Sequence, residues 1–239
     1  QEGADILDLG GESSRPGSVP VPLAEELARV LPLVREAVKL GVPLSVDTYK
    51  PQVMQAVLDL GADIVNDIWA LRQGGASDPG SALQVVARHP GCGVCLMHMH
   101  GEPLTMQLSP MQGDVVAQVR QFFEARVKAL RELDVAADRI VIDPGIGFGK
   151  TVVQNFALLA DQQSLLTLGY PLLAGWSRKS SLAAICGNSL GSVATLDARE
   201  RLVPSVTAAL LAVERGASIV RVHDVAETVQ ALKVLAAIR

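Results

Sequence analysis

Three polar side chains stand at or near the ends of short apolar runs. Asp47 closes PLSVD, Asn66 lies near the end of DIVND, and Asp143 closes RIVID. Their donors and acceptors match the edge of an amide-like heterocycle. A buried carboxylate is rarely left without a partner, so acids in these positions indicate a ligand. The alternative for the first of them is capping of the next helix by Asp47 or Thr48, ahead of Pro51.

Basic residues follow other apolar runs. Arg15 lies in the glycine-rich loop GGESSRPG, where it is either a bidentate anion ligand or a surface arginine. Arg221 and His223 are two residues apart on one face of a strand end, which suits a di- or pyrophosphate. Lys179 has three open roles: Schiff-base nucleophile, phosphate ligand, or cation over a ring. Its place four residues after Gly175 favours contact or charge over covalent chemistry.

The segment 142–151, IDPGIGFGKT, ends like the phosphate-binding loop G-x-x-x-x-G-K-[ST]. Pro144 replaces the first glycine of that pattern and has no N–H to donate to a phosphate. We therefore expect the chemistry to lie at Asp143, with glycines that let the backbone turn tightly beside a flat ligand. Lys150 and Thr151 are expected to begin the next helix.

Two sequence pairs suggest metal or redox chemistry. Cys92 and Cys95 form C-x-x-C, but the motif enters an apolar strand instead of opening a helix, so buried unpaired thiols are favoured. His98 and His100 are at most half of a metal site, with Glu102 the only carboxylate evident nearby. The neighbouring methionines are expected to line the pocket and the core.

The overall composition excludes several classes of protein. The chain has 239 residues, of which 49% are hydrophobic and 19% charged, which predicts a globular rather than a disordered chain. A net charge of −4 gives no sign of nucleic-acid binding. No apolar run is long enough to cross a bilayer and no export signal opens the chain, so a cytoplasmic protein without a membrane partner is expected.

The elements that position these residues alternate. Continuous apolar runs predict seven buried parallel strands, at about 5–9, 43–47, 63–67, 93–98, 139–143, 171–175 and 218–222. Helices are expected between them, at about 23–40, 51–60, 80–89, 114–134, 153–168, 199–215 and 225–237. Glycines behind several helical stretches predict left-handed helix ends. Residues 1–239 are thus expected to form a single α/β domain of βα units.

Two parallel folds compete for this pattern, an open doubly wound sheet and a barrel. An open sheet concentrates its site at one switch point, whereas a barrel gathers one site from all its carboxyl strand ends. Polar residues follow nearly every strand here, which favours a (β/α)₈ TIM barrel. Residues 1–3 look like the end of a helix, so we expect the first strand and helix of the barrel to lie upstream of a truncated chain.

The segments together resemble the dihydropteroate synthase family of pterin-binding barrels. The matching stretches extend over essentially the whole chain and are, in order, GGESSRPG, SVDT, IVNDI, CLMHM, IDPGIGFGK, SRKS and RVHD. The resemblance implies a transferase of folate biosynthesis and a sulfonamide target, working as a homodimer with Mg²⁺. It implies that 6-hydroxymethyl-7,8-dihydropterin diphosphate and p-aminobenzoate are joined to give 7,8-dihydropteroate and pyrophosphate.

The resemblance also implies roles for single residues. Those expected to hold the pterin are Asp47, Asn66, Asp143 and Lys179, and the catalytic ones are Asp47, Asp143 and Lys179. Those expected to take the diphosphate are Arg15, Arg221 and His223. Those expected to border p-aminobenzoate are Ser14, Pro16, Phe148 and Ser177, with Met97 also lining the pocket. The implied path is S_N1-like, helped by positioning and charge stabilisation rather than covalent catalysis.

One departure from the family keeps other functions open. The family's first strand and its following loop, which supplies the Mg²⁺ ligand, have no counterpart, so no residue is assigned to metal. A pterin-binding barrel without turnover is therefore an alternative. A pterin-dependent methyltransferase barrel is another, although SRKS and RVHD favour diphosphate chemistry. A Schiff-base aldolase using Lys179 is the least favoured.

Overall fold

The computed structural model describes residues 2–15, 17–75, 77–187 and 196–238. Within them the strands are β1 (Leu7–Gly10), β2 (Leu44–Asp47), β3 (Ile64–Asp67), β4 (Gly93–Met97), β5 (Ile140–Asp143), β6 (Leu173–Ala174) and β7 (Ile219–Val220). All the paired strands are parallel. The seven predicted strands are confirmed within the described residues, although β6 and β7 are shorter than expected.

Each strand lies beside the strand that precedes it in the chain. Strands β1 to β5 form one sheet in chain order, and β6 pairs with β7. A parallel bridge between Ile142 and Leu172 joins β5 to the segment that leads into β6. A doubly wound sheet reverses its strand order at the switch point, whereas a barrel keeps chain order. The order therefore confirms the expected barrel architecture and excludes the open sheet.

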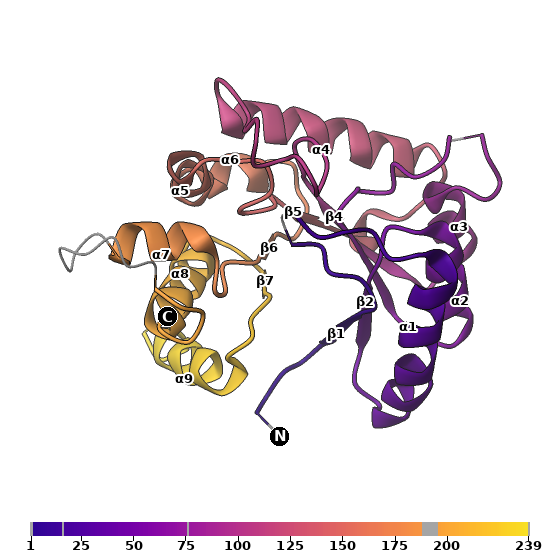
Figure 1. Cartoon of the computed structure of the whole chain (residues 1–239), viewed down its shortest axis with the longest axis horizontal. Coiled ribbons are helices and arrows are strands. Elements are labelled where there is room, and N and C mark those ends of the chain that lie inside the picture. Colours follow the sequence, from indigo (N-terminus) through magenta and orange to yellow (C-terminus); the bar gives the residue numbers. More distant parts are fainter. Residues whose placement is uncertain (1, 16, 76, 188–195, 239) are drawn as a thin grey trace.

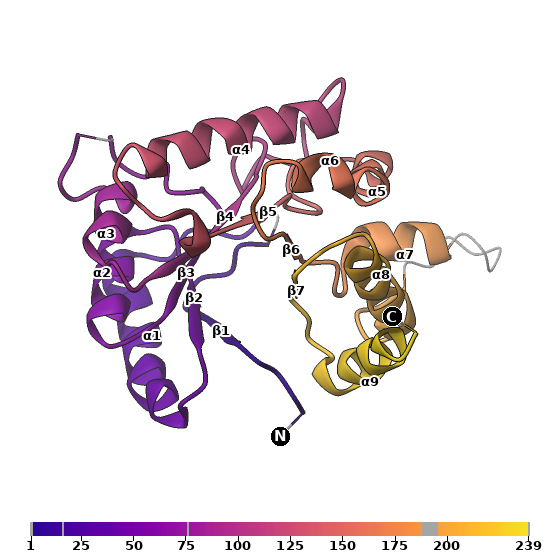
Figure 2. The same ribbon diagram turned by 180° about the vertical axis from the view of Figure 1, so that it is seen from behind.

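The helices lie around the outside of the strands (Figures 1 and 2). They are α1 (Leu23–Ala37), α2 (Pro51–Asp59), α3 (Ala82–Arg88), α4 (Val115–Arg131), α5 (Val152–Ala160), α6 (Gln162–Leu166), α7 (Ser180–Gly187), α8 (Leu202–Glu214) and α9 (Val225–Ala236). Short 3₁₀ turns cover Val38–Leu40 and Ala137–Arg139. Such a layer of helices covers the outer face of the sheet, while the inner face is buried by side chains inside the barrel.

Two helical expectations were wrong in detail. The expected helix 153–168 is divided in two, because Asp161 leaves the helical conformation with φ −107° and ψ 34° between α5 and α6. Helix α7 was not predicted as a separate helix. It begins at Ser180, directly after Lys179, and its small and mixed residues carry little apolar periodicity for a sequence pattern to detect.

Glycines set the return from helix to strand, as predicted. Gly61 has φ +98° three residues before β3 begins, and Gly216 has φ +95° three residues before β7 begins. Glycine adopts this left-handed conformation without the steric cost that a Cβ brings. These turns fix where each following strand begins, and thereby which of its residues reaches the site.

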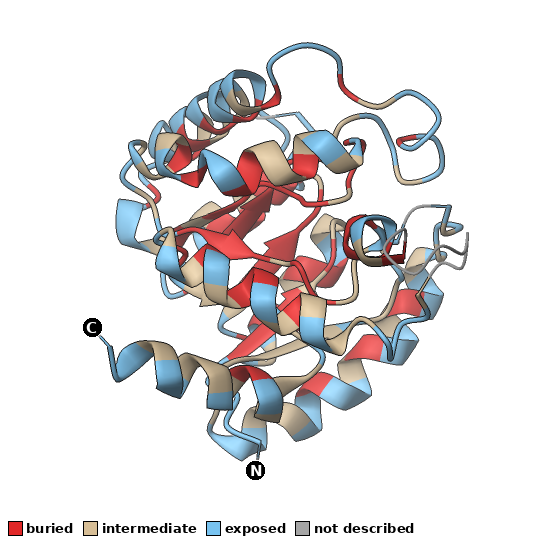
Figure 3. Ribbon diagram, turned by 90° about the vertical axis from the view of Figure 1, so that its left-hand side faces the viewer, coloured by how far each residue is buried: buried red, intermediate tan, exposed pale blue. Residues whose placement is uncertain are grey.

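The core lies between the strands and the helices that cover them. Leu44 and Val46 of β2 and Ile140 and Ile142 of β5 are fully buried, and helix α4 contributes Phe123 to the same interior. Figure 3 shows the buried residues along the strands and on the inward faces of the helices, with exposed residues on the outward faces. The prediction of buried parallel strands is thus confirmed for β2 to β6. It is wrong for β1 and β7, which are half-buried because each pairs with a neighbouring strand on one side alone in the described residues.

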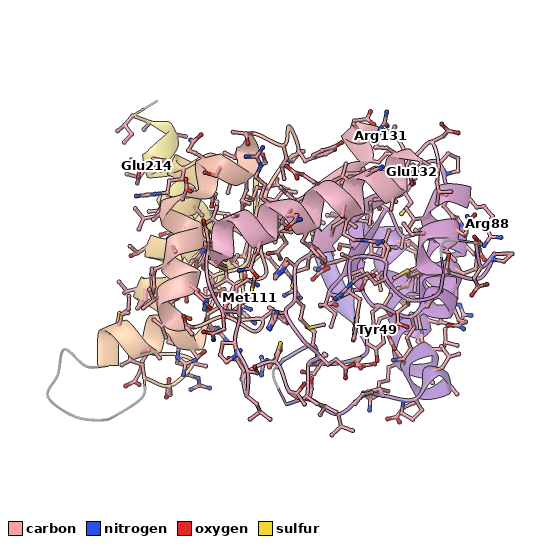
Figure 4. The ribbon with its side chains drawn as sticks, turned by 90° about the horizontal axis from the view of Figure 1, so that it is seen from above. Tyr49, Arg88, Met111, Arg131, Glu132 and Glu214 are labelled. Carbon is pink, nitrogen blue, oxygen red and sulfur yellow. The ribbon has the colours of Figure 1, made fainter. Side chains whose placement is uncertain are left out.

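The two ends of the barrel differ in what they carry. Figure 4 shows Arg131 and Glu214, at the carboxyl ends of α4 and α8, at one end of the molecule, and Tyr49 and Met111, in loops that follow β2 and β4, at the opposite end. In barrel enzymes the loops that follow the strands build the site. Within the described residues, no helix is long and apolar enough to span a bilayer.

Candidate active site

The strand register brings the predicted pterin-binding residues to the carboxyl ends of neighbouring strands. Asp47 at the end of β2 lies opposite Asn66 of β3, and Met97 at the end of β4 lies opposite Asp143 at the end of β5. Asn66 and Asp143 are buried, each with 8% of its surface exposed. The carboxyl ends of parallel strands thus carry the residues that the sequence singled out.

An arginine from the last strand holds the acids of the first two strands. Arg221 follows β7, and its Nε donates to Asp8 Oδ2 at 2.5 Å while a terminal guanidinium nitrogen donates to Asp47 Oδ2 at 3.4 Å. Asn66 Nδ2 donates to the same Asp8 oxygen at 3.5 Å. The contact joins β1 and β7, which are not paired by backbone hydrogen bonds in the described residues.

Asp8 is the site residue that sequence reasoning missed. It lies inside β1, two residues before Gly10, which is opposite Asp47 in the register. Its Oδ1 is buried and has no hydrogen-bond partner. Such an orphaned acceptor needs an explanation, and a ligand that donates a hydrogen bond provides one. The available signal was a single acid inside an otherwise apolar strand.

The acids are held in an environment that disfavours their charge. Burial, together with the neighbouring Asp8, raises the pKa of Asp47 to about 7, while Arg221 acts in the opposite direction. Burial also raises the pKa of Asp143, although Asp143 Oδ1 accepts a hydrogen bond from the Gly145 N–H at 2.7 Å. Strongly shifted acids in one place are typical of functional sites.

Lys179 lies over an aromatic ring beside these acids. Its Nζ is 4.4 Å from the ring centroid of Phe148, a cation–π arrangement. Burial lowers the pKa of Lys179 to about 8, and the charge of Asp143 opposes the change most strongly. Phe148 itself packs with Met97 in a small apolar cluster. Of the three roles predicted for Lys179, this geometry favours the cation over a ring.

Two further pairs join the loops that follow β6 and β7. Ser177 Oγ and His223 Nδ1 are 2.9 Å apart, and the His223 N–H donates to the same hydroxyl at 3.1 Å. Arg178 donates to both carboxylate oxygens of Asp224, at 2.6 and 3.2 Å. The two predicted ligands Ser177 and His223, assigned to different substrates, are therefore direct neighbours.

The loop after β1 lies across the mouth of the site. Ser14 lines a pocket together with Asp47, Tyr49 and Trp69. Arg15 is exposed, and its charge is close enough to lower the pKa of Lys179. Pro16, which was also predicted to border the arylamine, lies outside the described residues.

The segment that resembles a phosphate loop has another structure. The ammonium of Lys150 is buried and donates to the backbone oxygens of His98, Gly145 and Phe148. Thr151 caps α5 in a capping box with Gln154, which confirms that the helix begins here. Lys150 is therefore committed to protein carbonyls and does not present its charge to a nucleotide.

The other sequence alternatives find no support in the geometry. Helix α2 has Lys50 as its N-cap residue and no side-chain cap, so Asp47 does not serve as a helix cap. Cys92 and Cys95 are buried free thiols. In the part of the chain that the structure describes, no three His, Cys, Asp or Glu side chains are grouped to hold a metal.

Comparison with known proteins gives one consistent family. The family described as pterin binding enzyme matches residues 1–223. The dihydropteroate synthase of Neisseria meningitidis serogroup B is 45% identical over 238 residues, which is 98% of this chain and 79% of that protein.

Solved structures agree with this assignment. Burkholderia cenocepacia dihydropteroate synthase complexed with 7,8-dihydropteroate is 56% identical, with a TM-score of 0.88 over 100% of this chain and 82% of that one. Xanthomonas albilineans dihydropteroate synthase with 4-aminobenzoic acid is 45% identical, with a TM-score of 0.88 over 99% of this chain and 80% of that one. The fold, the site and these similarities together show that the chain belongs to the dihydropteroate synthase family of pterin-binding enzymes.

Proposed function

We propose that this chain joins 6-hydroxymethyl-7,8-dihydropterin diphosphate to p-aminobenzoate, giving 7,8-dihydropteroate and pyrophosphate. The observation that carries the proposal is the convergence of polar side chains from six strands or their loops, namely Asp8, Asp47, Asn66, Asp143, Lys179 and Arg221. The related structures complexed with 7,8-dihydropteroate and 4-aminobenzoic acid support the same reaction.

The acids suit the pterin ring. Its amino-pyrimidinone edge carries N–H donors, and the carboxylates of Asp47 and Asp143 are acceptors. Asn66 offers both a donor and an acceptor through one amide. The unpartnered Oδ1 of Asp8 adds a fourth acceptor deeper in the barrel. In this proposal Lys179 lies against the ring face, as it lies against Phe148 in the unliganded structure.

The diphosphate suits the basic side chains at the mouth. Arg221 presents a guanidinium with nearly half of its surface exposed, 48%, so part of its hydrogen-bonding capacity is free for an anion. We assign Arg15 and His223 to the same anion. Arg15 and Arg221 both lower the pKa of Lys179, and both also lower the pKa of His223, so these groups lie in one region of the site. When Arg221 turns to the diphosphate, Asp8 and Asp47 are released to accept from the pterin.

The chemistry then needs little covalent help. The bond between the pterin methylene carbon and the diphosphate oxygen breaks, and the electron pair leaves with pyrophosphate. The arylamine nitrogen attacks the resulting pterin cation, a C–N bond forms, and the nitrogen loses a proton. The protein contributes by holding the reactants in line and by stabilising the separated charges. The carboxyl groups of Asp47 and Asp143 beside the ring place negative charge near the cationic pterin when they are ionised.

The Mg²⁺ implied by the resemblance finds no matching donor set. The carboxylates of the site are spread over separate strands, and Asp8 and Asp47 are held by an arginine. Within the described residues the side chains do not fit a resident metal, and no step is assigned to one. The cytoplasmic location expected from the sequence stays a prediction.

We also propose that the chain forms a homodimer. Support comes from exposed apolar side chains on two neighbouring helices, Ile185 of α7 and Val203 and Leu211 of α8, which are 47%, 73% and 36% exposed. Exposed apolar residues that cluster are typical of protein–protein contacts. Light scattering of the chain and of Val203→Asp tests this, and a monomeric unsubstituted chain would contradict it.

The function is tested with the chain and both substrates. We expect 7,8-dihydropteroate and pyrophosphate in equal amounts, measured by chromatography and by a pyrophosphate-coupled assay. Asp143→Asn is expected to abolish most of the turnover. Calorimetry with a pterin separates the alternatives: binding without turnover supports a pterin-binding barrel that is not an enzyme. Preferential binding of methyltetrahydrofolate supports a methyltransferase barrel instead.

A further inference from the structure

One buried cation in the site region is not used by the proposed reaction. Lys150 has only 3% of its surface exposed, and its ammonium lies between two loops. Nζ donates to the backbone oxygens of Gly145 at 3.0 Å, Phe148 at 3.1 Å and His98 at 3.3 Å. A lysine ammonium has three N–H donors, so these three carbonyls use all of them.

The three carbonyls come from the loops that follow β4 and β5. These loops approach so closely that a Cβ on Gly145 would lie 1.9 Å from the His98 carbonyl oxygen. Gly145 also has φ +67°, a conformation that side chains rarely adopt. The ammonium of Lys150 donates to the carbonyl oxygens of both His98 and Gly145, so it links the two loops at the place where they approach most closely.

The same loops fix two groups of the site. The Gly145 N–H donates to Asp143 Oδ1 at 2.7 Å, and the His98 N–H donates to the Asp143 backbone oxygen at 2.9 Å. Phe148 carries the ring over which Lys179 lies. Each carbonyl that Lys150 holds therefore belongs to a residue that contacts Asp143 or Lys179.

The charge of Lys150 is kept at a free-energy cost. Burial lowers its pKa to about 7, and the charge of Asp143 opposes the change. A buried cation is tolerated only when its partners satisfy it, and an apolar side chain of similar volume avoids the cost. A cost of this kind at one residue is typical of a position that serves function.

We propose that Lys150 is a positioning residue for this site. Its ammonium holds the loops after β4 and β5 in the arrangement that places Asp143 at the pterin edge and Phe148 beneath Lys179, without touching either substrate. The inference rests on the proposed function, because Asp143 and Lys179 are assigned to the pterin. Phe148 is expected to border the arylamine, but two of the three carbonyls belong to His98 and Gly145, which hold Asp143. The inference predicts that Lys150 acts on pterin binding and turnover more than on the arylamine.

The test compares Lys150→Ala with the unsubstituted chain and with a control, Lys39→Ala. Lys39 is exposed and pairs only with the exposed Glu36 in the described structure. Calorimetry with a pterin and steady-state kinetics with both substrates are measured for each protein. For Lys150→Ala we expect pterin affinity and kcat each to fall about 30-fold, the effect of a small misplacement of site groups. The KM for p-aminobenzoate is expected to change less than about threefold, and Lys39→Ala is expected to behave like the unsubstituted chain.

Added methylammonium provides a second readout. The truncated side chain leaves space beside three carbonyls, and methylammonium brings the same charge and three N–H donors. We expect it to restore much of the pterin affinity of Lys150→Ala and to leave the control unchanged. Tetramethylammonium, which has no N–H donor, is expected to restore none.

Each outcome decides between the proposals. If the unsubstituted chain neither binds pterin nor turns over, the proposed function fails. If it does both and Lys150→Ala binds pterin within about threefold of it, the function stands and the positioning role is wrong. If Lys150→Ala does not fold, Lys150→Gln, which keeps two donors, is expected to fold and to bind pterin weakly. Loss of folding in both variants would make Lys150 a residue of the core and overturn the proposal.

Discussion

Two clusters beside the first two strands have the same composition, one cation between two carboxylates. In one cluster Lys50 lies between two glutamates, and in the other Arg221 lies between two aspartates. The lysine side chain is 14% exposed and the arginine 48%. The cation of the first cluster is thus mostly shielded from solvent, whereas the cation of the second is accessible to a ligand.

The Lys50 cluster is complete. Its ammonium binds one carboxylate oxygen of Glu12 and one of Glu26, and lies 4.7 Å from the ring centroid of Tyr49. The remaining oxygen of Glu12 accepts from Tyr49 at 3.1 Å, and that of Glu26 accepts from Thr48 at 2.7 Å. All four carboxylate oxygens of the two glutamates have a partner, so the cluster fastens the loop after β1 to α1 and α2.

The Arg221 cluster is incomplete. Asp8 Oδ1 has no partner, the contact to Asp47 is long at 3.4 Å, and much of the guanidinium is exposed. Asp47 also has a pKa raised by burial, so its charge is weakly held. The comparison teaches that completeness of hydrogen bonding, more than composition, separates a structural ion cluster from one arranged to exchange partners with a ligand.

The largest expected effect comes from breaking the Lys50 cluster. Lys50→Met leaves two buried carboxylates without a counter-charge, and we expect the free energy of unfolding to fall by about 3 kcal/mol. Urea denaturation measures it. The matched control, Lys39→Met, removes an exposed pair and is expected to cost less than about 0.5 kcal/mol. A loss below about 1 kcal/mol for Lys50→Met would contradict the structural role.

Breaking the Arg221 cluster is expected to lower pterin affinity rather than stability. Asp47→Asn removes the charged acceptor, and we expect pterin affinity to fall about 100-fold, equivalent to about 2.7 kcal/mol. The free energy of unfolding of the unliganded protein is not expected to fall, because a carboxyl that is disfavoured as an anion is replaced by a neutral amide. Calorimetry and urea denaturation measure the two quantities, with the exposed Asp138→Asn as control. If the binding free energy of the pterin and the free energy of unfolding fell by equal amounts, the Arg221 cluster would be as structural as the Lys50 cluster.

The same variant tests the charge of Asp47 through pH. Its pKa in the folded state is about 7, above the ordinary value of 3.8, so the folded protein keeps a proton that the unfolded chain has released. Its contribution to stability is therefore lost as pH rises from about 4 to 7. We expect the unfolding free energy to fall less between about pH 5 and pH 8 in Asp47→Asn than in the unsubstituted protein, by about 1 kcal/mol. An identical pH dependence in the two proteins would show that Asp47 titrates normally.

A third ion pair gives the smallest expected effect. Arg178 and Asp224 form a bidentate pair, but their side chains are 34% and 18% exposed. Asp224→Asn is therefore expected to lower the unfolding free energy by about 0.5 kcal/mol. Because the pair joins the loops that carry Lys179 and His223, we expect the KM for the pterin diphosphate to rise about threefold. A larger loss of stability would show that this pair is structural, like the Lys50 cluster.

The sequence predicted the positions of the strands and most residues at their ends. Apolar runs that close in a polar residue, as at Asp47 and Asp143, are a local pattern, and the register confirms that both lie at carboxyl strand ends. Asp8 was missed because it lies inside its apolar run. The one local signal, an acid within the strand, does not show which side chains that acid meets. The role of Lys150 was also missed, since its acceptors are backbone oxygens, one of them 52 residues away.

The sequence by itself determined the order of βα units, the glycines that end the helices and the chemical types available to the site. Only the tertiary structure decided which charges meet. Arg221 and Asp8 are 213 residues apart, and they come together because the barrel wall curves the last strand back toward the first. Local periodicity fixes elements through nearest neighbours, whereas partners at this separation depend on packing across the whole barrel.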